Sequence, residues 1–159
     1  MKIIDAETIN ERSSYKVTQV DEYSVRFITS DGVRYLVGFH NDIFIFDNNA
    51  YWLYVINENE PQKRDPKVGQ TIITIIQDLF RHTSDSVSLY VCSPSEGQQE
   101  TRHRLFKGWF ANACFTEQFT LETHHQVDNG KDFYYGLILR KDNIDHDWII
   151  KTFHEFFED

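Results

Sequence analysis

The sequence predicts an α+β fold in which a mixed, mostly antiparallel sheet carries three helices. Apolar and polar residues alternate through most of residues 15–46, as they do in half-buried strands. After residues 65, 98 and 145 the apolar spacing changes to three and four residues, which is typical of helices. Short strand-like runs separate these helical segments. We therefore expect the element order β-β-β-(β)-β-α-β-α-β-β-α.

The first half of the chain predicts a meander of strands. A compact hairpin turn is expected at residues 30–32, because Gly32 accepts the positive φ that such turns need. The expected strands cover residues 15–20, 23–28, 33–39, an optional short strand at 43–46, and 51–56.

A helix start follows at Asp65 and Pro66, since Asp is a favoured N-cap and Pro suits the first helical position. This helix should end near residues 82–83, before a strand at 87–92. A second helix is expected after a cap at Ser95, with one apolar face. That face comprises Leu105, Phe106, Trp109, Phe110 and Ala113.

The C-terminal part predicts a hairpin and a closing helix. Strands at 119–123 and 133–139 flank a turn at residues 128–130, which contains Asn129 and Gly130. Asn143 or Asp145 caps the last helix. Its expected buried stripe comprises Trp148, Ile149, Phe153, Phe156 and Phe157.

A chain of 159 residues with 40% apolar and 15% aromatic residues is long enough to form one domain with its own core. We expect a single domain over residues 1–159, in which residues 1–14 are a more loosely attached segment. This composition excludes a disordered or low-complexity protein.

The formal net charge of −9 is spread along the whole chain. Such a protein is repelled by phosphate backbones and by anionic membranes, so we expect neither as a partner. The longest apolar run, residues 51–56, is too short to cross a bilayer. Cys92 and Cys114 favour two reduced thiols and a cytoplasmic location, with a single disulfide as the alternative.

Several segments from Asp65 onward resemble an uncharacterised bacterial family. They are residues 65–68 with Thr71 and Ile72, and the segments 89–92, 102–106 and 140–143. The resemblance implies a bacterial source and assigns no activity.

The element order from Tyr15 to Leu139 also resembles the fold of GNAT acyltransferases, which implies an acyl-CoA cofactor. That family binds pyrophosphate at a helix start through an Arg/Gln-x-x-Gly-x-Gly/Ala motif. With Gly69 as the first glycine of the motif, Pro66 and Thr71 occupy its outer positions and do not match it. Phe106 stands where the family often has a tyrosine acid. An intact acyltransferase is therefore not expected.

Two groups of basic residues lie near predicted helix starts. Arg102, Arg104 and Lys107 belong to the second helix, and Lys63, Arg64 and Lys67 precede or begin the first. If both helices follow neighbouring strands, their starts open at one edge and can hold a small anionic ligand. The alternative is that these cations are solvated and pair with Glu96 and Glu100. The expected ligand-binding residues are Arg64, Lys67, Gly69, Gln70, Thr71, Cys92 and Arg102.

The remaining cysteine, histidine and aromatic residues do not predict a specific reaction. Cys92 is either a nucleophile, with His103 as the nearest base in sequence, or a buried structural thiol. His124 and His125 should point to opposite faces of a strand, and the seven histidines show no metal-ligand spacing, so no metal site is expected. The aromatic residues Trp52, Tyr54, Trp109 and Tyr134 belong to a core or stack on a ligand.

Three functions remain open. The first is a GNAT-like domain that binds a small anionic ligand, and the second is an interaction module or homodimer. The third is a degenerate acyl-CoA-dependent acyltransferase. Catalytic residues and substrate are unknown.

Overall fold

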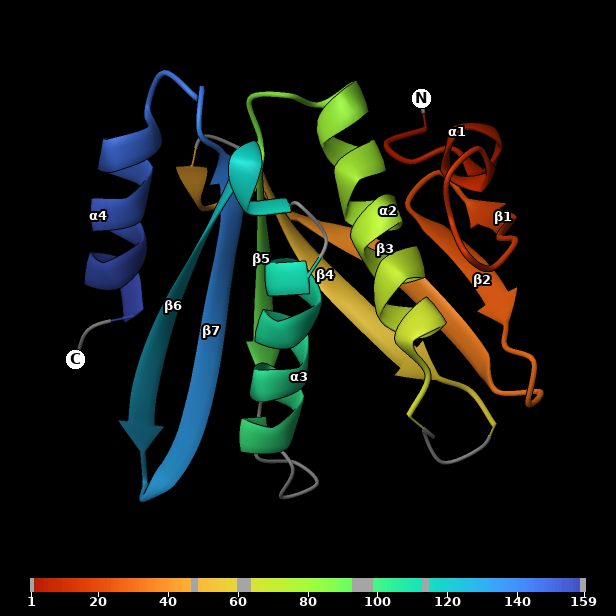
Figure 1. The fold of residues 1–159 in the computed structure, drawn as a ribbon. Helices are drawn as coiled ribbons and strands as arrows, with labels where there is room; N and C mark the ends of the chain where they lie inside the picture. Colours follow the sequence, from red (N-terminus) through yellow and green to blue (C-terminus); the bar gives the residue numbers. More distant parts are fainter. Residues whose placement is uncertain (1, 47–48, 60–63, 93–98, 113–114, 158–159) are drawn as a thin grey trace. The chain divides into compact units, whose positions relative to one another are not determined.

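A computed structural model describes residues 2–46, 49–59, 64–92, 99–112 and 115–157 (Figure 1). Within these residues the chain forms four α-helices and seven strands. The strand pairs whose register the structure describes are antiparallel, so the predicted α+β class is confirmed. The chain divides into two compact units, the N-terminal unit (Met1–Asn41 and Tyr51–Ser84) and the C-terminal unit (Asp42–Ala50 and Asp85–Asp159).

The N-terminal unit contains the predicted meander. Its strands are β1 (Thr18–Asp21), β2 (Ser24–Ile28), β3 (Arg34–Asp42) and β4 (Ala50–Asn57). They are neighbours in that order. The turn between β2 and β3 is the predicted one: Thr29 N donates to Val33 O at 2.8 Å, and Gly32 has a φ of 79°.

Helix α2 (Pro66–His82) covers the strands of this unit, as Figure 1 shows. Its start is the predicted one, with Asp65 as N-cap and Pro66 in the first turn. The sequence did not predict the five-residue helix α1 (Ala6–Asn10), which packs beside α2. The buried carboxylate of Asp78 joins the two helices, because it accepts hydrogen bonds from Asp5 N (2.8 Å) and Thr8 Oγ1 (2.5 Å).

The C-terminal unit contains β5 (Val87–Cys92), β6 (Phe119–Asp128) and β7 (Lys131–Arg140) in the order β5-β7-β6. The predicted hairpin turn is present, with positive φ at Asn129 (52°) and Gly130 (74°). The unit also contains α3 (Gln99–Asn112), a 3-10 helix at Phe115–Glu117 and α4 (His146–Phe157).

Helices α3 and α4 pack on opposite faces of the strands β5, β7 and β6. Tyr134 of β7 stacks on His103 of α3, whereas the next residue, Tyr135, stacks on Phe157 of α4. Successive residues of a strand point to opposite faces, so adjacent positions of one strand serve two different surroundings.

Residues 43–46 are a turn and not the optional short strand. The Asp42 carboxylate accepts from Phe44 N at 2.9 Å, and Phe46 has a φ of 52°, which ends the extended backbone. Phe44 is 90% exposed. Part of the loop that follows lies outside the described residues.

The expected stripe of α4 is wrong at two positions. Ile149, Phe153 and Phe157 are buried at a spacing of four residues, whereas Trp148 and Phe156 are 53% and 56% exposed. Both exposed residues precede a buried one and lie to the side of the narrow apolar face.

The interior is as aromatic as the composition predicted. The largest fully buried side chains include Phe27, Phe39, Phe80, Phe110, Phe115 and Phe153. No helix in the described parts of the chain has the length and apolarity needed to cross a membrane.

Candidate functional site

The start of α2 is closed by the chain's own side chains. Asp65 Oδ1 accepts from Lys67 N at 3.0 Å, and Asp65 Oδ2 accepts a short hydrogen bond from the Tyr15 hydroxyl. The helix therefore already has a carboxylate at the position where helix starts bind external anions. Burial raises the pKa of Tyr35, and the negative charge of the Asp65 carboxylate adds to this rise.

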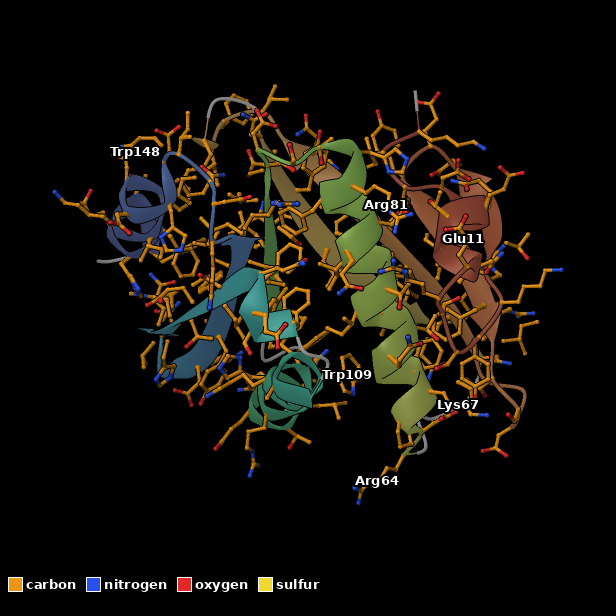
Figure 2. All side chains as sticks on the ribbon, turned by 45° about the horizontal axis from the view of Figure 1, so that its top comes forward. Glu11, Arg64, Lys67, Arg81, Trp109 and Trp148 are labelled. Atoms are coloured by element: carbon orange, nitrogen blue, oxygen red, sulfur yellow. The ribbon has the colours of Figure 1, made fainter. Side chains whose placement is uncertain are left out.

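Arg64 and Lys67 lie together at this helix start, and Figure 2 shows both side chains there. Both residues are exposed. The Lys67 ammonium lies 5.9 Å from the centre of the Tyr15 ring, a cation–π distance. Lys63 lies outside the described residues.

The next expected residues hold the N-terminal segment against α2. Gln70 Oε1 accepts from Ser14 N at 2.5 Å, and Gln70 Nε2 donates to Arg12 O at 3.0 Å. Thr71 Oγ1 accepts from Tyr15 N at 3.1 Å and is itself buried. Gly69 is also buried. The polar groups of Gln70 and Thr71 thus have partners within the N-terminal unit.

In the C-terminal unit the structure brings Cys92 and Arg102 together. Burial raises the pKa of the Cys92 thiol to about 11, and the nearby positive charge of Arg102 opposes that rise only in part. The thiol is protonated at neutral pH, and the described residues give it no hydrogen-bonding histidine. This arrangement corresponds to the buried structural cysteine and not to an activated nucleophile. Cys114, Ser95 and Glu96 lie outside the described residues.

His103, which the sequence offered as a base for Cys92, belongs instead to a stack of rings. Its ring lies 4.8 Å from that of Tyr134 at an interplanar angle of 19°, and Tyr134 lies 4.6 Å from His125 at 6°. Asp132 holds His125 through a 2.6 Å contact to Nε2. The buried end of the stack is Tyr90, whose hydroxyl lies 3.4 Å from His103 Nδ1.

A glycine makes room for Tyr90. A Cβ atom at Gly136, the residue opposite Tyr90 on β7, would lie 1.9 Å from the Tyr90 ring. The N-terminal unit repeats this arrangement, because a Cβ at Gly38 would lie 2.4 Å from the Tyr54 hydroxyl. The other face of Tyr90 carries Phe106, with ring centres 5.0 Å apart, so the candidate position for a tyrosine acid packs in an aromatic cluster.

The two buried titratable groups of this stack, His103 and Tyr90, are held in their neutral forms. Burial, followed by the charges of Lys107 and His125, lowers the pKa of His103. Burial raises the pKa of Tyr90 well above its usual range, and the Cys92 thiolate adds to this effect.

Two exposed cations of α3 lie beside the stack. Arg104 and Lys107 form no ion pair within the described part of the chain. Burial, Glu100 and Asp132 together raise the pKa of Tyr134, and the charge of Arg104 opposes that rise only in part. The charge of Lys107 adds to the burial that lowers the pKa of His103. Sequence analysis found these cations but missed the stack, because its members come from α3, β5, β6 and β7.

The opposite face of the same strands carries a second polar cluster. His124 Nδ1 lies 2.9 Å from His154 Nδ1, and Glu122 Oε1 lies 2.7 Å from His154 Nε2. The prediction that His124 and His125 point to opposite faces is confirmed, since His125 belongs to the ring stack. No set of three or more His, Cys, Asp or Glu side chains suited to a metal ion occurs within the described residues.

Comparison with known proteins adds one finding. The model of a family of unknown function (DUF6169) matches residues 64–155, which include α2, β5, α3 and the β6–β7 hairpin. No curated protein matches the chain.

Proposed function

The chain belongs to DUF6169, a family of unknown function, and we propose that it binds a small anionic ligand at the α3 cations beside the ring stack. The observation that carries this proposal is that Arg104 and Lys107 lack ion pairs among the described residues while adjoining His103 and Tyr134. Unpaired cations next to flat rings bind carboxylates and phosphates favourably. Arg102, close to Cys92, lies on the same helix as these two cations.

The residues of α2 that the sequence indicated remain a separate prediction, confined to the start of that helix. Arg64 and Lys67 supply positive charge at the helix start, and Gly69, Gln70 and Thr71 form the turn behind them. Because Asp65 already occupies this helix start, we expect an anion to bind there more weakly than at the α3 cations.

A thermal-shift screen tests the binding function. The probes are inorganic phosphate, coenzyme A, acetyl-CoA and nucleotides, since a ligand that prefers the folded state raises the melting temperature. We expect at least one of them to stabilise the natural protein and to lose about tenfold in affinity in Arg102→Glu and Lys107→Glu. Arg64→Glu should lose about threefold or less.

The matched control is Lys141→Glu, which reverses an exposed charge of the C-terminal unit after β7. Equal affinity in the Lys107→Glu, Lys141→Glu and natural proteins would show that the α3 cations bind no ligand. If only Arg64→Glu loses affinity, the ligand belongs to α2 instead.

A degenerate acyltransferase is the narrower form of this proposal. It rests on the GNAT-like element order, and Pro66, Thr71 and Phe106 depart from that family's pattern. Stabilisation by acetyl-CoA and coenzyme A, but not by phosphate or nucleotides, would favour it.

The second candidate function is self-association through α4. Trp148 and Phe156 are more than half exposed on this helix, and Figure 2 shows Trp148 on it. Light scattering should then give a doubled mass that Phe156→Asp abolishes. A monomeric mass for the natural protein would exclude this candidate.

The wider setting that we propose is a cytoplasmic bacterial protein without nucleic-acid partners. The free, buried thiol of Cys92 and the net charge of −9 support the location and the absence of nucleic-acid binding. The bacterial source rests on the sequence resemblance alone.

A further inference from the structure

Three rings of the C-terminal unit form a stack that ends at an exposed ring. His103 of α3 is buried, Tyr134 of β7 is half-buried and His125 of β6 is exposed. The ring centres lie 4.8 Å and then 4.6 Å apart, with interplanar angles of 19° and 6°. Each ring therefore covers a face of the next. The outer face of His125 has no ring partner among the described residues.

This outer face of His125 is directed away from β7. His125 lies opposite Tyr134 in the register of β6 and β7, and the two rings are parallel. β6 is the last strand in the order of the described sheet, so no described strand lies beyond it. The His125 side chain is 49% exposed. A flat group can thus approach the ring face from the side of the edge strand.

The neighbours of His125 prepare this face for another ring. The Asp132 carboxylate lies 2.6 Å from His125 Nε2, and a contact at a ring nitrogen fixes the ring through its edge and leaves its face uncovered. Val127, two residues along the strand and so on the same side of the sheet, is 54% exposed. A ring that is already ordered, next to an apolar side chain, favours stacking by an aromatic group.

We propose that the ligand of the α3 cations is a planar aromatic anion, represented by adenosine monophosphate, whose ring stacks on the outer face of His125. This inference rests on the proposed anion site and specifies the class of its ligand. Arg104 and His125 both adjoin Tyr134, since the charge of Arg104 opposes the rise in the pKa of Tyr134 and the His125 ring lies against it. One molecule can therefore engage both.

The charges around the stack orient such a ligand. Asp132 repels an anionic group from the edge of His125. On α3, Arg104 and Lys107 outnumber Glu100, which lies one turn before Arg104 and is the other carboxylate that raises the pKa of Tyr134. We therefore expect the aromatic ring to lie over β6 and the anionic group to point toward α3.

Calorimetric titration of the full chain with three probes tests the proposal. Adenosine monophosphate carries the ring and the anion, ribose phosphate carries the anion alone, and adenosine carries the ring alone. We expect adenosine monophosphate to bind about tenfold more tightly than either of the others, because a base gains about this much from stacking on an aromatic side chain.

Three variants separate stacking from other effects. His125→Ala should remove the advantage of adenosine monophosphate over ribose phosphate. His125→Phe should keep it, since this variant retains a flat ring. The matched control is His40→Ala, which removes an exposed histidine from a strand of the N-terminal unit and should also keep it.

Nuclear magnetic resonance locates the ring of the ligand. The methyl groups of Val127 should show an upfield ring-current shift with adenosine monophosphate and no such shift with ribose phosphate. If His125→Ala does not fold, this shift and the affinity of His125→Phe still decide, because both are measured on proteins that keep a ring at this position.

Three results would overturn the inference. Adenosine monophosphate could bind no more tightly than ribose phosphate, its advantage could survive in His125→Ala, or His125→Phe could lose as much as His125→Ala. Failure of the anion site itself gives a different result, in which Lys107→Glu leaves the affinity for ribose phosphate unchanged.

Discussion

The start of α2 and the exposed face of α3 carry similar basic residues, but the polar groups around them differ in whether they already have partners. At α2 the polar groups are already used: Asp65 caps the helix and receives the Tyr15 hydroxyl, and Gln70 and Thr71 hold the preceding segment. At α3, Arg104 lies beside stacked rings without an ion pair among the described residues. The two basic clusters therefore differ in the partners of their polar groups and not in their density in the sequence.

The largest expected effect concerns the two glycines that make room for a tyrosine ring, one in each unit. Gly136→Ala forces a Cβ to 1.9 Å from the fully buried Tyr90 ring, which has no room to move, and should destabilise the protein by about 3 kcal/mol. Gly38→Ala meets Tyr54, which is only half-buried, but also Ser24 Cβ at 2.7 Å. Its cost should be about 1–2 kcal/mol. Urea unfolding of both variants measures the two losses in the free energy of unfolding. A larger loss for Gly38→Ala than for Gly136→Ala would contradict this prediction.

The next effect concerns the closed helix start. Asp65→Ala removes the cap of α2 and the acceptor for the Tyr15 hydroxyl, and should cost about 1–2 kcal/mol in urea unfolding. Asp65→Asn keeps a capping oxygen and should cost less than half as much.

The same pair of variants tests what closes the helix start. If the charge of Asp65 excludes anions there, Asp65→Asn should bind inorganic phosphate more tightly than the natural protein, as nuclear magnetic resonance shifts of residues 66–68 would report. Unchanged phosphate binding would mean that the helix start is closed by packing and not by charge.

The smallest expected effect is a pH dependence of the α3 face. The pKa of His103 is lowered by burial, Lys107 and His125, so the folded protein binds fewer protons than the unfolded chain as pH falls below about 6.5. His103 therefore contributes its full share of stability above that value and loses it as pH falls toward the lowered pKa. Thermal melts at pH 7.5 and pH 5 should show a smaller difference in His103→Phe than in the natural protein. If the change in melting temperature between the two pH values were the same in both proteins, His103 would not contribute to the pH dependence.

The fold was largely predictable because its signals are local. Asp65 with Pro66, and the positive-φ residues Gly32 and Gly130, mark their helix start and turns by residue type alone. Helix α1 was missed because five residues carry too little periodicity, and its stability comes from distant contacts to Asp78. The exposure of Trp148 was missed because apolar character does not distinguish a core face from its border.

The candidate sites were less predictable because they join distant segments. The pair His124 and His154 is thirty residues apart, and the stack of His103, Tyr134 and His125 joins three elements. Motif spacing detects ligands that share one helix or loop. The register of β6 against β7 places His125 opposite Tyr134, whereas the packing of α4 and α3 on the strands supplies His154 and His103.

That register couples the two faces of the hairpin. On β6, position 124 serves the histidine pair and position 125 serves the ring stack, and each is fixed opposite its partner on β7. Inserting or deleting one residue in this strand would invert every side chain beyond that point. Both clusters would then be lost in a single event, so this hairpin should tolerate substitutions but not changes in length.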